Sequence, residues 1–136
     1  MTDGVRVTSG FDGRGVPRAI MRSRQASERA VELLARFGAR EATRLASASL
    51  YPPASSPGSP PARRTGSLEQ SIDRSVSVIE RDGGFVGIYG TTTGYGQFLE
   101  LGTSDMAARP FLRPSLDLAA REAGQILRRA FRALDR

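Results

Sequence analysis

The chain is 136 residues long, which is typical of one domain with a single modest hydrophobic core. It contains no cysteine and no histidine, and all 20 of its basic residues are arginine. Disulfides, thiolate chemistry, histidine general bases, lysine-dependent phosphate loops and Schiff bases are therefore excluded. We expect no cofactor, no metal site and no enzymatic activity.

The net charge of +6 is unevenly distributed along the chain. Residues 1–64 carry 11 arginines against 5 acids (+6), residues 65–112 carry 3 against 6 (−3), and residues 113–136 carry 6 against 3 (+3). A basic chain is compatible with nucleic-acid binding. The arginines are, however, neither interleaved with aromatic residues nor placed on a recognisable DNA-binding module. We interpret them as solvated or interface residues and keep nucleic-acid binding as the less favoured alternative.

The first part of the chain predicts one short strand and one long helix. Residues 4–9 alternate apolar and polar side chains as a strand does, and the glycines and proline of residues 11–17 predict a turn. From about residue 18 the apolar residues recur at helical spacing, which predicts a helix over residues 26–50. Gly38 lies inside this helix, and we interpret it as a site of close packing against a neighbouring element.

Residues 51–64 end this helix, because a segment with five prolines and three serines cannot form part of a core. A loop of this length within a compact domain is usually functional or disordered. Two interpretations stay open, a mobile linker and an arm that becomes ordered against a partner, and in both we expect the loop to be mobile in the isolated subunit. As a docking loop, its candidate contact residues are Pro52, Pro53, Pro57, Pro60, Pro61, Arg63 and Arg64.

The middle of the chain predicts a short helix followed by a β-hairpin. Ser67 and Gln70 fit a capping box, which predicts a helix over residues 67–73. Residues 75–81 and 85–89 alternate as strands do, and the Asp-Gly pair between them is a strong signal for a two-residue hairpin turn.

Residues 95–114, here called the elbow, combine a short helical segment, a glycine stop and two prolines. The apolar residues between 95 and 99 share one helical face, and Gly102 follows where a residue of positive φ ends a helix. Pro110 and Pro114 fix their own φ angles and favour extended geometry in the residues before them. The elbow is therefore predicted to be rigid.

Together these elements predict an α+β fold in which a small, mainly antiparallel sheet with a β-hairpin is packed by the long N-terminal helix and by a C-terminal helix. The C-terminal helix is predicted over residues 114–134, whose apolar residues form one continuous stripe. We expect residues 1–136 to form a single domain. The predicted core consists of Val31, Leu34, Leu45, Val76, Val78, Val86, Ile88, Phe98, Leu99, Phe111, Leu116, Leu127 and Leu134.

Glu100 is the acid that we expect to be enclosed, because it lies within an apolar run. We expect the elbow to bring Arg109 back toward its carboxylate, which would make Glu100 a paired group rather than a catalytic one. No second acid lies at a spacing typical of a general acid–base pair, and the serines have no base to activate them. Glu69 and Glu80 are expected to be exposed.

Three short motifs occur in a fixed order around the predicted hairpin. They read Thr-Gly-x-Leu-x-x-Ser-Ile at residues 65–72, Tyr-Gly-x-Phe-Leu-Glu-x-Gly-Thr at residues 95–103 and Arg-Pro-Phe-Leu-Arg-Pro at residues 109–114. This combination resembles the head–tail joining proteins known as tail-completion, or tail-terminator, proteins of long-tailed double-stranded-DNA phages and phage-derived particles. The motif residues expected to form an interface are Thr65, Gly66, Leu68, Tyr95, Phe98, Glu100, Gly102, Thr103, Arg109, Pro110, Phe111 and Arg113.

The resemblance implies a structural virion protein that forms a ring, commonly a hexamer, at the head-proximal end of the tail. Such a ring ends the growth of the tail tube and joins it to a stopper or connector protein on the head side, and DNA is only passing cargo. The acidic centre and basic flanks of this chain can meet head to tail, the type of contact that closes rings. Another neck ring, such as an adaptor or stopper, is the main alternative.

The expected location follows from the same resemblance and from two absences in the sequence. No apolar run is long enough to cross a membrane, and no charged-then-apolar leader opens the sequence. We expect a protein of a virion or phage-like particle, assembled in the host cytoplasm, without membrane contact.

Overall fold

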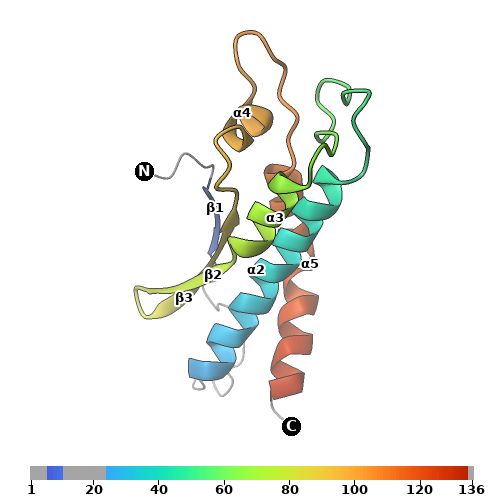
Figure 1. Cartoon of the computed structure of the whole chain (residues 1–136). Coiled ribbons are helices and arrows are strands. Elements are labelled where there is room, and N and C mark those ends of the chain that lie inside the picture. Colours follow the sequence, from blue (N-terminus) through green and yellow to red (C-terminus); the bar gives the residue numbers. More distant parts are fainter. Residues whose placement is uncertain (1–5, 11–23, 135–136) are drawn as a thin grey trace.

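The computed structural model describes residues 6–10 and 24–134, and these residues form an α+β fold (Figure 1). The predicted fold class is therefore confirmed. The predicted turn at residues 11–17 lies outside the described residues. In chain order the elements are β1 (Arg6–Gly10), α2 (Arg24–Ala46), α3 (Ser67–Arg74), β2 (Ser77–Arg81), β3 (Gly84–Gly90), α4 (Gly96–Leu101) and α5 (Leu112–Leu134).

The sheet has three strands in the order β1-β3-β2, and both pairings are antiparallel. The predicted hairpin joins β2 to β3, with Ser77 opposite Ile88. Its turn residues Asp82 and Gly83 have φ angles of 52° and 77°, the left-handed values that a tight hairpin turn requires. Because β3 lies in the centre, the outer edges of β1 and β2 have no neighbouring strand in the described sheet.

The two long helices lie side by side, and α2 also packs on β3 (Figure 1). Helix α2 ends at Ala46, four residues before the predicted end. The amides of Ser47 and Ala48 donate to the carbonyls three residues earlier, which closes the helix with a tighter turn. Helix α5 begins at Leu112, so Pro114 lies in its first turn, where a missing amide hydrogen costs nothing.

Helix α3 forms as predicted, but the predicted capping box is wrong. The N-cap position is Gly66 with φ 86°, and no side chain caps this end of the helix. The hydroxyl of Ser67 instead hydrogen-bonds the hydroxyl of Thr65, at 2.9 Å between the oxygens. Ser67 is the first helical residue and therefore one position too late to act as the cap.

The core contains two clusters of buried residues, and both include residues of α2 and α5. The cluster near α3 contains Ala39, Ala42, Ala46, Leu68, Ile72, Tyr89, Phe111 and Leu112, and the cluster at the other end contains Ala30, Leu127, Ala130 and Phe131. Val31, Leu34, Phe111 and Leu127 were predicted and are buried. The predicted core residues Leu45, Val76, Val78, Val86, Ile88, Leu99 and Leu116 are only partly buried. Phe98 is 47% exposed, so its assignment to the core is wrong, and the side chain of Leu134 lies outside the described residues.

Gly38 is where α2 meets the ring of Tyr89. A Cβ atom at Gly38 would lie 2.5 Å from Cε1 of that ring, so only glycine permits this approach. Tyr89 is 1% exposed, and its hydroxyl lies 2.8 Å from the hydroxyl oxygen of Ser115 on α5. Burial raises the pKa of Tyr89 above its ordinary value, against an opposing effect of the hydrogen bond to Ser115. The interpretation of Gly38 as a close-packing site is confirmed.

Leu127→Ala should lower the free energy of unfolding by about 2–5 kcal/mol, because it leaves a cavity between α2 and α5. Leu101→Ala is the matched control, since Leu101 is 72% exposed, and should change stability by about 0.5 kcal/mol or less. Urea unfolding of both variants measures the difference. A loss below about 1 kcal/mol for Leu127→Ala would contradict the assignment of this stripe to the core.

Candidate functional site

Glu100 joins the short helix α4 to the start of α5. Its carboxylate accepts three backbone N–H groups at 2.8 Å each: Oε2 accepts those of Phe111 and Leu112, and Oε1 accepts that of Arg113. These amides open α5 and have no partner within the helix. A negative charge at this position also complements the positive end of the helix dipole. Glu100 is 8% exposed, so its charge is stabilised by the helix N-terminus rather than by water.

The predicted pairing of Glu100 with Arg109 is wrong, because Arg109 contacts the proline-rich loop instead. The guanidinium of Arg109 donates through Nε and Nη2 to the backbone oxygen of Ser55, at 3.2 Å in both cases. The backbone N–H of Arg109 donates to the carbonyl of Leu99 at 2.6 Å. Arg109 therefore connects the elbow to the loop, while Glu100 connects the elbow to α5.

The turn after α4 is closed by Gly102, whose φ of 76° confirms the predicted positive φ. A Cβ atom at Gly102 would lie 2.8 Å from the backbone nitrogen of Ala108, so the returning chain leaves no room for a side chain. The N–H of Thr103 donates to the carbonyl of Met106 at 2.8 Å across the turn. These contacts fix the path between α4 and α5.

The proline-rich loop, residues 51–64, is attached to the rest of the molecule at its base and near its tip. At the base, Tyr51 donates to the carbonyl of Arg63, and Arg63 donates to that of Ser49, both at 2.8 Å. Near the tip, the N–H of Gly58 donates to the carbonyl of Ala108 at 2.9 Å. Whether the loop is mobile in the isolated subunit stays a prediction, and these bonds are what such motion would break.

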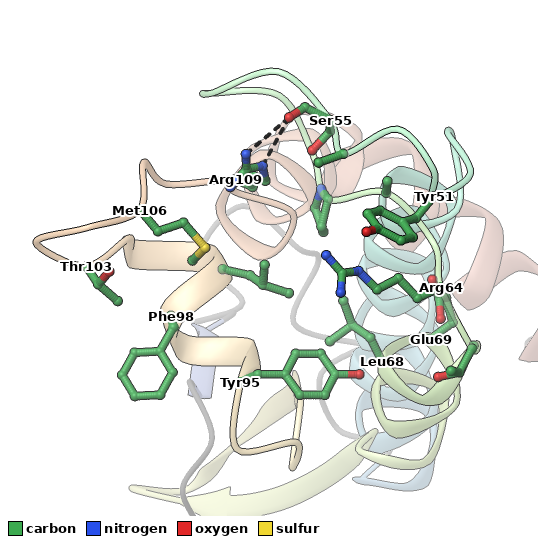
Figure 2. A pocket seen from close by; sticks show the side chains of 16 residues that line it. Tyr51, Ser55, Arg64, Leu68, Glu69, Tyr95, Phe98, Thr103, Met106 and Arg109 are labelled. Carbon is green, nitrogen blue, oxygen red and sulfur yellow. Dashed lines mark hydrogen bonds between the residues drawn. The ribbon is translucent and has the colours of Figure 1, made fainter.

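A pocket of about 660 Å³ lies between the proline-rich loop, the start of α3, and α4 with the following turn (Figure 2). Its walls are mainly apolar and aromatic, with three charged side chains among them. It is lined by Tyr51, Ala54, Ser55, Pro61, Ala62, Arg64, Thr65, Gly66, Leu68, Glu69, Tyr95, Phe98, Leu99, Thr103, Met106 and Arg109.

The charged groups in the pocket differ in their partners. The guanidinium of Arg64 lies over the ring of Tyr51, 3.9 Å from its centre, and Figure 2 shows this side chain crossing the pocket. Glu69 was predicted to be exposed but is only 8% exposed, because the loop folds back over the start of α3. Burial raises the pKa of Tyr95, the nearby Glu69 carboxylate raises it further, and Arg64 lowers it.

Exposed apolar side chains lie in the segments that form the pocket, and three of them, Tyr51, Tyr95 and Phe98, line it. Leu50 and Tyr51 lie at the base of the loop and are 68% and 46% exposed. Tyr95, Phe98 and Leu101 lie at or in α4 and are 46%, 47% and 72% exposed. The loop and α4 lie at the same end of the molecule, opposite the C-terminal end of α5 (Figure 1). We call these five residues the apolar rim.

The predicted site residues separate into three groups. Those that line the pocket are Thr65, Gly66, Leu68, Tyr95, Phe98, Thr103 and Arg109 from the motifs, with Pro61 and Arg64 from the loop. Those that do not line the pocket but hold the elbow in place are Glu100, Gly102, Pro110 and Phe111, of which Phe111 is fully buried. Those that lie apart are Arg113, which forms an exposed pair with Asp117, and Pro52, Pro53, Pro57, Pro60 and Arg63.

Sequence reasoning missed several lining residues as parts of the site, chiefly Tyr51, Glu69 and Met106. Tyr51 carried a usable signal, since an aromatic residue beside a run of prolines is a candidate for an anchor. Glu69 carried no such signal in the sequence, because only the return of the loop encloses this residue.

Hydroxyl groups beside the pocket are engaged with one another. The hydroxyls near the pocket bond one another, with Ser71 2.6 Å from Thr91 and Thr91 2.9 Å from Thr93, and they tie α3 to the end of β3. Within the described residues, no group of three or more His, Cys, Asp or Glu side chains could hold a metal ion. The ring faces and the Glu69 carboxylate are among the groups that line the pocket and are available to a ligand.

The chain was compared with protein families, curated proteins and solved structures, and none of them matches. Among the helices in the described residues, none is both long enough and apolar enough to cross a membrane. The function must accordingly be inferred from the motifs and from the geometry of the pocket.

Glu100→Gln should lower the free energy of unfolding by about 1.5–3 kcal/mol, because the amide group has only one oxygen for three backbone donors and no charge. Glu28→Gln on α2 is the matched control, since Glu28 is exposed. Thermal and urea unfolding measure both variants. Equal stability of the two would show that the Glu100 carboxylate does not stabilise the elbow.

Arg109→Ala should release the proline-rich loop, because it removes both side-chain donors to Ser55. We expect trypsin to cleave after Arg63 or Arg64 about tenfold faster than in the parent chain, as the loss of a charged hydrogen bond predicts. Arg113→Ala is the control, because Arg113 is exposed and bonds only the exposed Asp117 through its side chain. Identical cleavage rates in both variants would contradict this role of Arg109.

Proposed function

We propose that this chain is a ring-forming head–tail joining protein of a long-tailed phage or phage-derived particle, of the tail-terminator type. The observation that supports this most is the convergence of the first two motifs and Arg109 of the third on one pocket with an apolar rim. The hairpin separates the first motif from the other two in sequence, and their meeting at one surface is what a shared binding role requires.

The apolar rim supports a role in protein assembly. Six large hydrophobic side chains in the described residues are clearly exposed, and five of them belong to the rim, with Ile79 as the exception. Several large exposed apolar side chains in neighbouring segments of a small domain are typical of a protein–protein contact. A pocket of this kind fits a structural protein better than an enzyme, because no nucleophile beside it has a base within reach among the described residues.

The distribution of surfaces supports a ring rather than a two-fold dimer. The rim lies at one end of the molecule and the arginine-rich half of α5 lies at the other (Figure 1). Contact between unlike surfaces repeats from copy to copy and forms a ring when the rotation closes. In this proposal the ring, of six copies, ends growth of the tail tube and contacts the stopper or connector, leaving an axial passage for DNA.

The test is a mass measurement of the purified chain, alone and with tail-tube subunits of the same particle. We expect an oligomer of six 14.6 kDa subunits, alone or on the tube end, and shorter tubes when the chain is present during polymerisation. Negative-stain images should show a ring with a central opening. Binding to head-side proteins with no effect on the tube would assign the chain to another neck layer. Salt-sensitive DNA binding without a discrete ring would favour the nucleic-acid alternative.

Phe98→Ser should weaken this assembly, because it removes an exposed ring from the apolar rim without opening the core. Ile79→Ser is the matched control, since Ile79 is similarly exposed, at 41% against 47%, but lies on β2 away from the pocket. Both variants should unfold at nearly the parent's temperature. Assembly that Phe98→Ser leaves intact would exclude the rim as the contact surface.

A further inference from the structure

Glu69 is the charged group of the pocket that lacks a partner. Its side chain forms no hydrogen bond and no ion pair with any described residue, although the residue is only 8% exposed. The two arginines of the pocket are both engaged, Arg64 over the ring of Tyr51 and Arg109 with the carbonyl of Ser55. The oxygens of this carboxylate stay accessible to solvent, since neither is among the buried side-chain atoms that lack a partner in the described residues. An accessible, unpaired carboxylate in the pocket favours a ligand group that is positively charged.

The aromatic rings that line the pocket define which cation fits. Tyr95 and Phe98 each expose about half of their surface at the pocket mouth. A guanidinium stacks on such rings and donates several parallel hydrogen bonds to a carboxylate, which an ammonium group does less well. Within the subunit, the guanidinium of Arg64 already stacks on the ring of Tyr51. The ligand class is thus an arginine side chain carried on another protein surface.

One face of α5 offers such arginines. Arg121 and Arg128 are exposed and form no ion pair or hydrogen bond with the described residues. Between them lies Gly124, exposed in the middle of the helix, where glycine is less favourable than alanine. Its own subunit gives no reason for the glycine, since a Cβ there would meet only the guanidinium of Arg128, at 3.8 Å. A close approach by another molecule would explain it.

This face cannot reach the pocket of its own subunit, because α5 is packed along α2 and carries the face away from the pocket end (Figure 1). We propose that the pocket of one copy binds the arginine face of α5 (Ala120, Arg121, Gly124 and Arg128) of the next copy. In this contact the Glu69 carboxylate accepts hydrogen bonds from a guanidinium of that face. The net charges of the two segments, −3 for residues 65–112 and +3 for residues 113–136, are complementary. This proposal rests on the proposed ring, and it identifies the two surfaces through which neighbouring copies meet.

Two variants test the contact, one on each surface. Glu69→Gln keeps the shape of the pocket and removes its charge, and the double variant Arg121→Glu/Arg128→Glu reverses the charge of the α5 face. Each variant alone should weaken self-association about tenfold or more, measured by sedimentation at low salt. A 1:1 mixture should form a complex of two subunits that grows no further, since each variant keeps one intact surface. Glu28→Gln and Arg40→Glu are the matched controls, because both residues are exposed on α2.

The mixture distinguishes this contact from association through a different surface. Self-association of either variant at the parent's affinity would overturn the proposal, and so would a mixture that stays monomeric. If Glu69→Gln fails to fold, Gly124→Leu provides an independent test, because it should block assembly while the monomer stays folded. A parent chain that forms rings and stops tube growth, with variants that do the same, would overturn this contact and leave the proposed function standing. A parent chain that never self-associates would overturn both.

Discussion

The carboxylate of Glu100 is the contact on which the pocket end of the molecule depends. Helix α4 has six residues, too few for a helix to be stable alone in water. Glu100 attaches it to α5 through three backbone amides that would otherwise lack partners. The same bonds start α5 at Leu112, before Pro114, and so set where this 23-residue helix begins. One buried side chain thereby places both the short helix and the long one.

The position of the proline-rich loop follows from this attachment. Once α4 is fixed to α5, the turn at Gly102 brings the chain back so that Ala108 bonds the loop at Gly58 and Arg109 bonds it at Ser55. The loop then closes over the start of α3, and the pocket is the space that remains. Its walls come from three segments distant in sequence, and these hydrogen bonds hold two of them together. The floor of the pocket is continuous with the core, because Leu68 belongs to the larger core cluster and Leu99 packs against it.

The elements with strong local patterns could be predicted from the sequence, and the long-range contacts could not. The apolar stripe of α5 and the Asp-Gly turn could be predicted, because residue spacing and local backbone preference alone determine these two structures. Phe98 has the same helical spacing as a core residue, yet it is half exposed, since periodicity identifies a face but not what covers it. The partners of Glu100 are backbone amides, which have no signature in the sequence. The same is true of Glu69, whose burial depends on where a distant loop returns.

The structure separates what stabilises the subunit from what is left for a partner. Small residues on α2, Gly38 among them, let Tyr89 and α5 pack closely, so the interior needs few large side chains. The larger apolar groups are thus not all required inside, and Tyr95, Phe98 and Leu101 can stay at the surface. An exposed rim of this kind invites indiscriminate association, which a net charge of +6 opposes over the rest of the surface. A partner must therefore match both the apolar rim and the unpaired acid beneath it, and this double requirement is what gives the surface selectivity.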